Sequence, residues 1–313
     1  MIIPFSNNCL VSVIVLSYNS ATTILETLNS VANQKYSPIE LIISDDCSND
    51  TTSIIIDNWI NENLTKFFKI VSISTPFNSG ISANINNALN FSTGEWIKLI
   101  AADDTLLPNC IEDNVIFAKN NPMAKIIQSS SFYFQEDIKQ DKFLYRRDVT
   151  KELIAKNMSP AFQYHILKWA PSINAPSIFI HKSIFQQVGF YDTNIASFDD
   201  WPMWLKISRS GISFYTMDKV TICYRVSSNS FSNKGRDLKI YSDVYLKLYD
   251  FSVEYLFAEM SYADRLFKKY EYYLHLYFDK LHLNRNKPIH KTLYVILISP
   301  LKFYSRMRIN FYK

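Results

Sequence analysis

The chain has 313 residues, of which 48% are hydrophobic and 20% charged, a composition typical of a folded protein and too apolar for a disordered one. Its net charge of +4 is too small to indicate a nucleic-acid-binding protein. It contains only five glycines, and no two lie closer than fourteen positions. Because the glycine-rich loops that bind dinucleotides or nucleoside triphosphates need two glycines within a few residues, the composition excludes both.

The four cysteines form no metal-binding pattern. Cys9, Cys47, Cys110 and Cys223 are far apart, without a C-x-x-C pair or a Cys/His cluster at zinc spacing. A secretory signal needs Lys or Arg before its apolar run, and none precedes the apolar run at residues 9–16. No window holds the roughly 20 apolar residues that a spanning helix needs. We therefore expect a cytoplasmic protein that is soluble or attached to a membrane surface.

Strands and helices alternate along the first 120 residues. Short apolar or β-branched runs predict strands at residues 11–17, 40–44, 68–74 and 95–100. Apolar residues at helical spacing predict helices at residues 22–34, 51–63 and 82–90. This alternation predicts an α/β fold with a doubly wound, mostly parallel sheet, whose ligand crevice lies beyond the carboxyl ends of the strands.

The pattern is mixed in the middle of the chain. Strand-like segments occur at residues 125–134, 177–181 and 213–224, and short helices lie between them. One of these helices carries Asp199 and Asp200. A domain of residues 1–235 is therefore expected, with halves at residues 1–120 and 121–235.

The end of the chain differs in charge and in aromatic content. Residues 236–280 are expected to be helical and are crowded with Tyr, Phe and Leu. Residues 280–313 hold eight Lys or Arg and no acidic residue, so the other 279 residues sum to −4. Residues 236–313 thus form a helical, basic and aromatic extension.

Two pairs of adjacent carboxylates follow predicted strands. Asp45 and Asp46 end the second strand, and Asp103 and Asp104 follow the fourth. At the ligand edge of a sheet such oxygens can bind a ribose, a base N–H, or a divalent cation whose shell substrate phosphates complete. The other interpretation of each pair is local, as a helix cap or a turn. Two pairs on neighbouring strand ends favour a binding site.

A series of collinear motifs resembles the nucleotide-sugar glycosyltransferases of family 2. The close part covers residues 11–118, with VSVIVLSYN at 11–19, SVANQ at 30–34, ELIISDDCSNDTT at 40–52, NSG at 78–80, GEWI at 94–97 and ADD at 102–104. A looser part continues to about residue 232, with PS at 176–177, VGFYD at 188–192, FDDWPMWL at 198–205 and YR at 224–225. The resemblance implies a GT-A fold, a nucleotide-sugar donor and inverting transfer, as in bacterial enzymes that build O-antigen and capsule.

The resemblance also implies donor-binding roles. The main chain of Leu16 and the ring of Tyr18 would hold the nucleotide base. Asp46 would accept the N3–H of a uracil, which favours UDP, and Asp45 would support the loop or the ribose. Asp103, the last acid of the metal-binding D-x-D motif, would hold Mn²⁺ or Mg²⁺ across the diphosphate.

The chain departs from the family pattern at two positions. Ala101 replaces the first acid of D-x-D, which removes one contact to ribose or metal and leaves Asp104 to stabilise the loop. Arg225 ends a strand that resembles the Y-R-x-H motif and would reach the diphosphate, because a guanidinium fork matches phosphate oxygens. Ser227 stands at the histidine position, so no histidine ligand is expected there.

The segment at residues 198–201 resembles the E-D motif of the family. Asp200, its second acid, would be the catalytic base, although the ordinary pKa of an aspartate, near 4, makes it a base through position more than strength. Asp199 and Trp201 would contact the acceptor, whereas Trp204 is expected to pack in the core. Direct displacement would invert the anomeric carbon. The processive Q-x-x-R-W signature is absent, which favours transfer of a single sugar.

Residues 291–313 combine an apolar stretch with Lys, Arg, Tyr and Phe. A cationic amphipathic segment of this kind suits the surface of an anionic bilayer, where a lipid-linked glycan acceptor would be anchored. We expect a protein peripheral on the inner face of the cytoplasmic membrane. The alternatives are a helix packed on the catalytic domain with solvated lysines and, with less support, a nucleic-acid-binding segment.

Two other functions compete with sugar transfer. A non-catalytic GT-A module that binds a nucleotide sugar or a partner is favoured by Ala101 and opposed by Asp103, Asp200 and Arg225. A nucleotidyltransferase would need a basic or glycine-rich triphosphate loop, and residues 18–23 contain no Lys, Arg or Gly. The sequence therefore predicts an inverting, metal-assisted glycosyltransferase.

Overall fold

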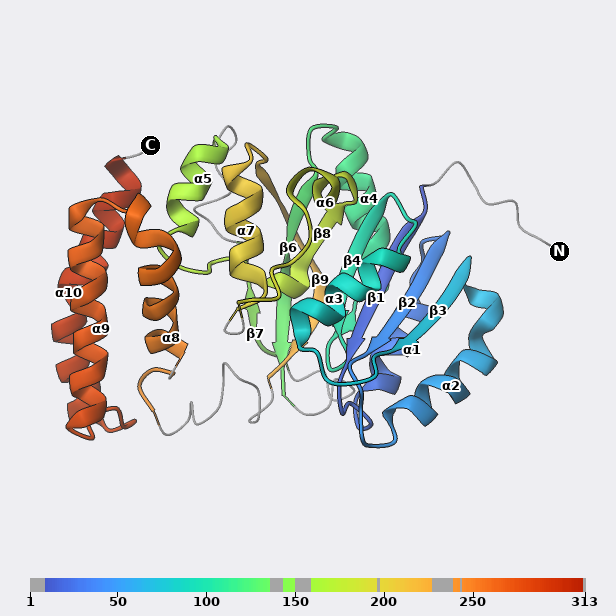
Figure 1. Cartoon of the computed structure of the whole chain (residues 1–313), viewed down its shortest axis with the longest axis horizontal. Coiled ribbons are helices and arrows are strands. Elements are labelled where there is room, and N and C mark those ends of the chain that lie inside the picture. The colour runs from blue at the N-terminus through green and yellow to red at the C-terminus, as the bar shows by residue number, and fades with distance from the viewer. Residues whose placement is uncertain are drawn as a thin grey trace. The chain divides into compact units, whose positions relative to one another are not determined.

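The computed structural model of the chain divides into two compact units (Figure 1). It describes residues 9–135, 143–149, 159–195, 198–226, 239–242 and 244–311. Unit 1 comprises Met1–Gln163 and Ser172–Arg225, and unit 2 comprises Tyr164–Pro171 and Val226–Lys313. The domain boundary expected at residue 235 lies outside the described residues.

A nine-stranded mixed sheet forms the frame of unit 1. Its order is β3-β2-β1-β4-β8-β6-β9-β5, and β7 pairs with β6. The strands are β1 (Val11–Ser17), β2 (Ile39–Asp45), β3 (Lys69–Ser74), β4 (Trp96–Ala101), β5 (Thr105–Leu106), β6 (Ile126–Phe134), β7 (Phe143–Arg147), β8 (Ile178–His181) and β9 (Phe214–Arg225).

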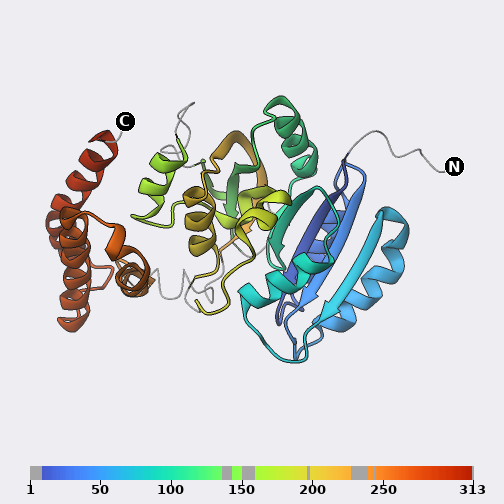
Figure 2. The ribbon, with the colours of Figure 1, turned by 45° about the horizontal axis from the view of Figure 1, so that its top comes forward.

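Strands β1 to β4 are parallel to one another, as the sequence predicts. The register places Leu16 beside both Ser44 and Ala101, so the carboxyl ends of β1, β2 and β4 lie together. The connecting helices are α1 (Ile24–Ala32), α2 (Thr52–Asn63) and α3 (Ile81–Phe91), with α1 and α2 on one face of the sheet and α3 on the other (Figures 1 and 2). Alternating side chains of β1 are buried against both layers, because this strand is central and both faces are covered.

The second half of the sheet changes strand direction. β8 lies antiparallel between β4 and β6, whereas β9 runs parallel to β6. Its helices are α4 (Cys110–Asn120), α5 (Pro160–Leu167), α6 (Ser183–Val188) and α7 (Asp200–Arg209). The predicted strands at 125–134, 177–181 and 213–224 agree with β6, β8 and β9 to within one residue at each end. β5 and β7 are not among the predicted strands.

Unit 2 contains helices α8 (Val244–Phe251), α9 (Tyr262–Lys280) and α10 (Pro288–Phe311). The helix predicted over residues 236–280 is interrupted by a π-helical turn at Ser252–Leu256 and a 3-10 turn at Phe257–Glu259. Ser261 then starts α9, because its hydroxyl accepts a hydrogen bond from Asp264 N at 3.0 Å. Residues 236–238 and 243 lie outside the described part of the chain.

A buried ion pair ties unit 2 together. Arg308 Nε lies 2.6 Å from Asp264 Oδ1, and Arg308 Nη2 donates to the carbonyl of His165 at 2.8 Å. Burial alone would raise the pKa of Asp264, but the Arg308 guanidinium and the Tyr304 hydroxyl hold it below its usual range. The pair therefore joins α9, α10 and the segment Tyr164–Pro171. In the described ranges, no helix is both long and apolar enough to cross a membrane.

Candidate active site

Side-chain hydrogen bonds join the loops that follow β1 and β2. Buried Asp45 accepts from the hydroxyls of Ser17 and Ser48, each at 2.6 Å, and from Ser48 N at 2.9 Å. Asn19 N donates to Ser48 Oγ at 2.7 Å, and Asn19 Oδ1 accepts from Asn49 N at 2.9 Å. These are the contacts of a residue that supports the loop, which is one of the two roles expected of Asp45.

Asp46 holds the segment that leads into α3. Its Oδ1 accepts from Thr75 Oγ1 at 3.0 Å and from the backbone N–H and hydroxyl of Ser79, each at 2.8 Å. Its Oδ2 accepts from Gly80 N at 2.8 Å, where a φ of +84° favours glycine. An ionised carboxylate offers about four acceptor positions. A uracil N3–H would therefore share Oδ2 with Gly80, and that contact stays a prediction.

Leu16 and Tyr18 lie at the carboxyl end of β1. The Tyr18 side chain is exposed, at 47% of its full area, so its ring offers a surface on which a base can stack. The carbonyl of Leu16 accepts from Ala102 N at 2.9 Å, so this part of its main chain is already bonded to the loop after β4.

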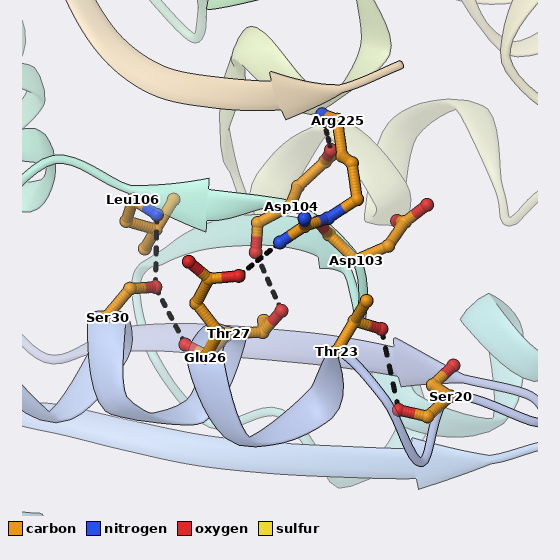
Figure 3. A network of polar contacts seen from close by, with 9 residues as sticks. All are labelled: Ser20, Thr23, Glu26, Thr27, Ser30, Asp103, Asp104, Leu106 and Arg225. Atoms are coloured by element: carbon orange, nitrogen blue, oxygen red, sulfur yellow. Dashed lines mark hydrogen bonds and ion pairs between the residues drawn. The ribbon is translucent and has the colours of Figure 1, made fainter. Parts of the chain in front are cut away.

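Arg225, at the end of β9, joins the loop after β4 to helix α1 (Figure 3). Its Nε donates to the carbonyl of Asp103 and its backbone N–H to Asp104 Oδ1, both at 2.8 Å. Its guanidinium forms an ion pair with Glu26 and lies over the ring of Phe134, 4.5 Å from the centroid. Arg225 is buried, and these contacts order the loop that presents Asp103. The expected contact of Arg225 with a diphosphate stays a prediction.

The two acids after β4 have different surroundings. Asp104 is buried, its carbonyl accepts from Thr27 Oγ1 at 2.7 Å, and its Oδ2 has no hydrogen-bond partner among the described residues. Burial and the charge of Asp103 raise the pKa of Asp104 well above its usual range. Asp103 is partly exposed, and burial raises its pKa while Arg225 opposes the rise. Asp104 is thus a loop residue, whereas the Asp103 side chain is partly open to solvent and its role as a metal ligand stays a prediction.

An open pocket lies among β1, β4, β8, α3 and α7, and we call it the α7 pocket. Its volume is about 550 Å³ when the solvent space at its mouth is included. Its apolar lining residues are Leu16, Ile81, Ile85, Leu99, Ile100, Ala101, Ala175, Pro176, Ile178 and Ile180. Its other lining residues carry polar groups and are Tyr191, Asp199, Asp200 and Trp204.

The acid pair at the start of α7 is electrostatically unusual. Burial and the adjacent charge of Asp199 raise the pKa of Asp200 to about 7. Burial also raises the pKa of Asp199, and burial together with both acids raises the pKa of Tyr191. Asp200 is therefore a stronger base than the ordinary aspartate that the sequence suggests.

The two tryptophans of α7 are both buried. Trp201, expected at the acceptor, is fully buried, packs edge-on against Phe198 with 5.8 Å between centroids, and is not a lining residue of the α7 pocket as the described residues define it. Trp204, expected in the core, is also buried but lines the pocket. Its Nε1 has no hydrogen-bond acceptor within the described part of the chain.

Sequence reasoning missed the residues of α1 that hold the loop after β4. Glu26 pairs with Arg225, Thr27 donates to the carbonyl of Asp104, and Ser30 Oγ accepts from Leu106 N at 3.0 Å (Figure 3). These three polar residues stand at positions i, i+1 and i+4 of a helix that otherwise buries apolar side chains. This spacing could have revealed them in the sequence, because it puts three polar side chains on one helix face.

The donors for a metal ion are few. The described residues bring together no group of three or more His, Cys, Asp or Glu side chains that could hold one. A magnesium or manganese ion that substrate phosphates complete needs only one or two carboxylates. Asp103 fits this requirement, because no other described side chain donates to its carboxylate and Arg225 fixes its carbonyl. Ser227 lies outside the described residues.

Comparison with known proteins assigns the family. Residues 12–189 match the family described as Glycosyl transferase family 2. The chain is 28% identical over 232 residues to the putative teichuronic acid biosynthesis glycosyltransferase TuaG of Bacillus subtilis (strain 168), covering 74% of this chain and 84% of TuaG. It is 26% identical over 236 residues to the UDP-Glc:alpha-D-GlcNAc-diphosphoundecaprenol beta-1,3-glucosyltransferase WfaP of Escherichia coli, covering 75% of this chain and 85% of WfaP.

A solved structure shares the fold. The crystal structure of S. aureus TarS 1-349 in complex with UDP-GlcNAc superposes with a TM-score of 0.58 at 17% sequence identity, covering 96% of this chain and 89% of that one. The predicted GT-A architecture, an α/β sheet flanked by helices with a helical extension, is confirmed, and the sheet is mixed because β5, β7 and β8 run antiparallel to their neighbours. Because the family match covers more than half of the sequence, the chain belongs to glycosyl transferase family 2.

Proposed function

We propose that the chain moves a single sugar, with inversion, from a nucleotide-sugar donor, preferably a UDP-sugar, to a lipid-linked glycan in bacterial surface-polysaccharide biosynthesis. One observation carries the proposal: the pocket that Asp200 lines extends to Ala101, two residues before Asp103. Asp103 follows β4 with a carboxylate that no other described side chain occupies, and partly buried Asp200 lines the α7 pocket together with Ala101. The names of TuaG and WfaP, which refer to teichuronic acid biosynthesis and to a diphosphoundecaprenol-linked acceptor, support the pathway.

The donor would lie across the ends of β1, β2 and β4. The exposed ring of Tyr18 would stack on the base, and Asp46 and the main chain of Leu16 would meet its polar edge. Asp103 would hold Mn²⁺ or Mg²⁺, which when bound offsets the charge that develops on the departing nucleoside diphosphate. Arg225 acts on this step through the loop, because it fixes the carbonyl of Asp103.

Asp200 would take the proton of the acceptor hydroxyl. A pKa of about 7 leaves about half of its carboxylate ionised at neutral pH and makes that form an effective proton acceptor. The acceptor oxygen bonds to the anomeric carbon as the bond to the diphosphate oxygen breaks on the opposite face. A donor with an α-linkage therefore gives a β-linked product, without a covalent intermediate on the protein.

Helix α10 supports an acceptor held at an anionic membrane. Ile289, Ile296 and Phe303 are spaced by seven residues and are 75%, 61% and 66% exposed. The same helix and the residue before it carry the exposed cations Lys287, Lys291, Lys302 and Arg306. Exposed apolar side chains with Lys and Arg nearby are typical of helices that lie in the membrane interface. The lipid tail of the acceptor would bring the sugar to the same surface.

Calorimetric titration with UDP, GDP, CDP and TDP, in Mn²⁺ and then in EDTA, tests donor binding. We expect UDP to bind with Mn²⁺ and more weakly in EDTA. Asp103→Asn should lower the Mn²⁺-dependent affinity about tenfold or more, because it removes the charged ligand. The matched control is Asp57→Asn, an exposed aspartate of α2. Failure of the folded protein to bind any nucleotide would favour the non-catalytic module.

Transfer itself is tested by Asp200→Asn. The amide keeps the shape of the side chain but cannot accept the proton, so transfer should fall about 100-fold or more while UDP binding persists. If this variant keeps near-full transfer with its fold intact, Asp200 is not the base.

A further inference from the structure

We infer that the α7 pocket binds the acetamido group of an N-acetylated sugar, an inference that rests on the transferase function proposed above. An acetamido group combines a methyl, a carbonyl acceptor and an N–H donor. The pocket offers a matching surface for each of these three parts.

The apolar wall of the pocket matches the methyl. Ile85 of α3 and Ile178 and Ile180 of β8 line it, and these side chains are 3%, 4% and 1% exposed. An isoleucine side chain neither donates nor accepts a hydrogen bond, so a sugar hydroxyl against this wall would lose its water without gaining a partner. A methyl group is favoured there because its burial removes apolar surface from water.

The Trp204 indole matches the carbonyl. The side chain is 1% exposed, lines the pocket, and its Nε1 has no acceptor in the described part of the chain. The Asp200 carboxylate lies close enough to this N–H for a weak hydrogen bond, which helps to lower the pKa of that acid. Buried indole N–H groups usually have a hydrogen-bond partner. A ligand carbonyl oxygen would complete the hydrogen bonding of this N–H.

The acid pair matches the amide N–H. Asp199 and Asp200 line the same pocket, and the raised pKa values of both show that charge there lacks solvation. A donor from the ligand would stabilise the ionised form of either acid. Of the two acids, Asp199 is available for this contact while Asp200 accepts the reacting proton.

An acetamido group can reach this pocket from two sources. Leu16 and Ala101 line the pocket and lie at the strand ends where the nucleotide is proposed to bind, so the group could belong to the donor sugar. Asp200 also lines the pocket and is the proposed base for the acceptor hydroxyl, so the group could equally belong to the acceptor sugar. The same contacts recognise the group in both cases, so paired ligands must separate the sources.

Calorimetry on the full chain in Mn²⁺ provides that separation. The donor arm compares UDP, UDP-glucose and UDP-N-acetylglucosamine. The acceptor arm, with UDP at saturation, compares octyl β-glucoside with octyl N-acetyl-β-glucosaminide, below their micelle concentrations. We expect the acetamido ligand to bind about tenfold more tightly than its hydroxyl counterpart in one arm. Equal affinities in both arms overturn the inference, whereas failure of UDP itself to bind overturns the proposed function.

Trp204→Phe tests the indole contact. The variant removes the N–H and keeps an aromatic ring, so the acetamido advantage should fall about fivefold, the effect of one buried hydrogen bond. Trp96→Phe, at the opposite end of β4, is the matched control for loss of a buried indole. An unchanged advantage in folded Trp204→Phe overturns the role of this residue. The ligand comparison on the unmodified protein decides the inference if the variant does not fold.

Discussion

Burial and one neighbouring charge oppose ionisation of the Asp200 carboxylate, and hydrogen bonds favour it. Asp199 adds a negative charge beside it, whereas backbone N–H groups at the start of α7 and the Trp204 indole favour the charged form. Burial is the largest influence, and the result is a pKa of about 7. A catalytic base with this pKa combines basicity with an ionised fraction near neutral pH.

Removal of the neighbouring charge should change the pH dependence of transfer. The base must be ionised, so kcat/KM of the unmodified protein should rise with pH through about 7 and then level off. Asp199→Asn removes a charge that raises the pKa of Asp200, so the rise should move to lower pH. The measurement is kcat/KM from about pH 5 to 9 for both proteins. If the rise of kcat/KM occurs at the same pH in both proteins, a group other than Asp200 causes it.

Glu26 is a positioning residue for Asp103. It pairs with the buried Arg225 guanidinium, whose Nε fixes the Asp103 carbonyl (Figure 3). In Glu26→Gln the guanidinium loses its charged partner, and the loop of Asp103 loses a restraint. We expect the Mn²⁺ affinity of the UDP complex to fall about tenfold, as for other partners behind a metal ligand.

Stability measurements separate this role from a general structural one. Glu26→Gln should also lower the free energy of unfolding by about 2 kcal/mol, the cost of losing a hydrogen bond between charged groups. Glu62→Gln, an exposed glutamate on α2, is the control. Lower stability with unchanged Mn²⁺ dependence would show that Glu26 acts on the fold alone.

At the scale of elements, the turn into β4 depends on a glycine with no room for a side chain. A Cβ at Gly94 would lie 2.5 Å from Ser12 N, 2.6 Å from Ser12 Oγ and 2.9 Å from the carbonyl of Leu10. Ser12 Oγ accepts from Gly94 N at 2.8 Å and donates to buried Glu40 at 2.7 Å. The close approach therefore links the start of β1, the start of β2 and the entry to β4.

Gly94→Ala should destabilise unit 1, because backbone atoms of β1 would have to move. We expect a loss of about 2 kcal/mol or more in the free energy of unfolding, measured by urea denaturation. Gly211→Ala is the control, since Gly211 has open space around it and only its φ of +87° opposes alanine. A smaller effect of Gly94→Ala than of Gly211→Ala would contradict the close approach as a large cost, because φ at Gly94 is not in the positive range that opposes alanine.

The elements that the sequence predicts well are those with a strong pattern. β1, β2 and β4 are buried apolar strands, and their bounds agree with prediction to within one residue at each end. β7 escapes prediction because all five of its residues are exposed, and β5 because it has only two residues. The break between α8 and α9 is also missed, since Tyr, Phe and Leu continue through it.

The candidate site follows the same rule. Acids at the ends of parallel strands must come together, so Asp45, Asp46 and Asp103 could be found from order alone. The partners of Arg225 could not, because the contact with Glu26 joins residues 199 positions apart. Burial, which sets the pKa of Asp200, also depends on packing that spacing does not encode.

At the scale of the whole molecule, the basic end of the chain is built into unit 2. Ile298 and Leu301 of α10 are buried with Leu274 and Phe278 of α9, so α10 is a packed helix. Its other sides expose the apolar and cationic groups described above. Deleting residues 288–313 would therefore unfold unit 2 as well as remove the proposed membrane contact. Point variants on the exposed side are the cleaner test.

Vesicle binding of the full chain tests the exposed face of α10. Combined Ile289→Ser, Ile296→Ser and Phe303→Ser should reduce co-sedimentation with phosphatidylglycerol vesicles about tenfold or more, because three exposed apolar side chains leave the interface. Binding should also weaken with added salt and be lower on phosphatidylcholine, since the cations lose their attraction.

The matched control changes apolar residues of similar exposure in unit 1. Ile54, Leu64 and Met123 are 59%, 57% and 79% exposed, and their combined replacement by serine should leave vesicle binding intact. Equal binding by the α10 variant and the unmodified protein would contradict a membrane role for this helix.

The division of the chain between units has a consequence for its synthesis. Tyr164–Pro171 belongs to unit 2, yet its partner Arg308 follows His165 by 143 residues. As the chain leaves the ribosome, this segment cannot make its contacts with Arg308 until α10 has been made. Unit 2 can therefore form only after α10 has been synthesised, whereas the sheet of unit 1 can assemble earlier, and the interval between them exposes the new chain to aggregation.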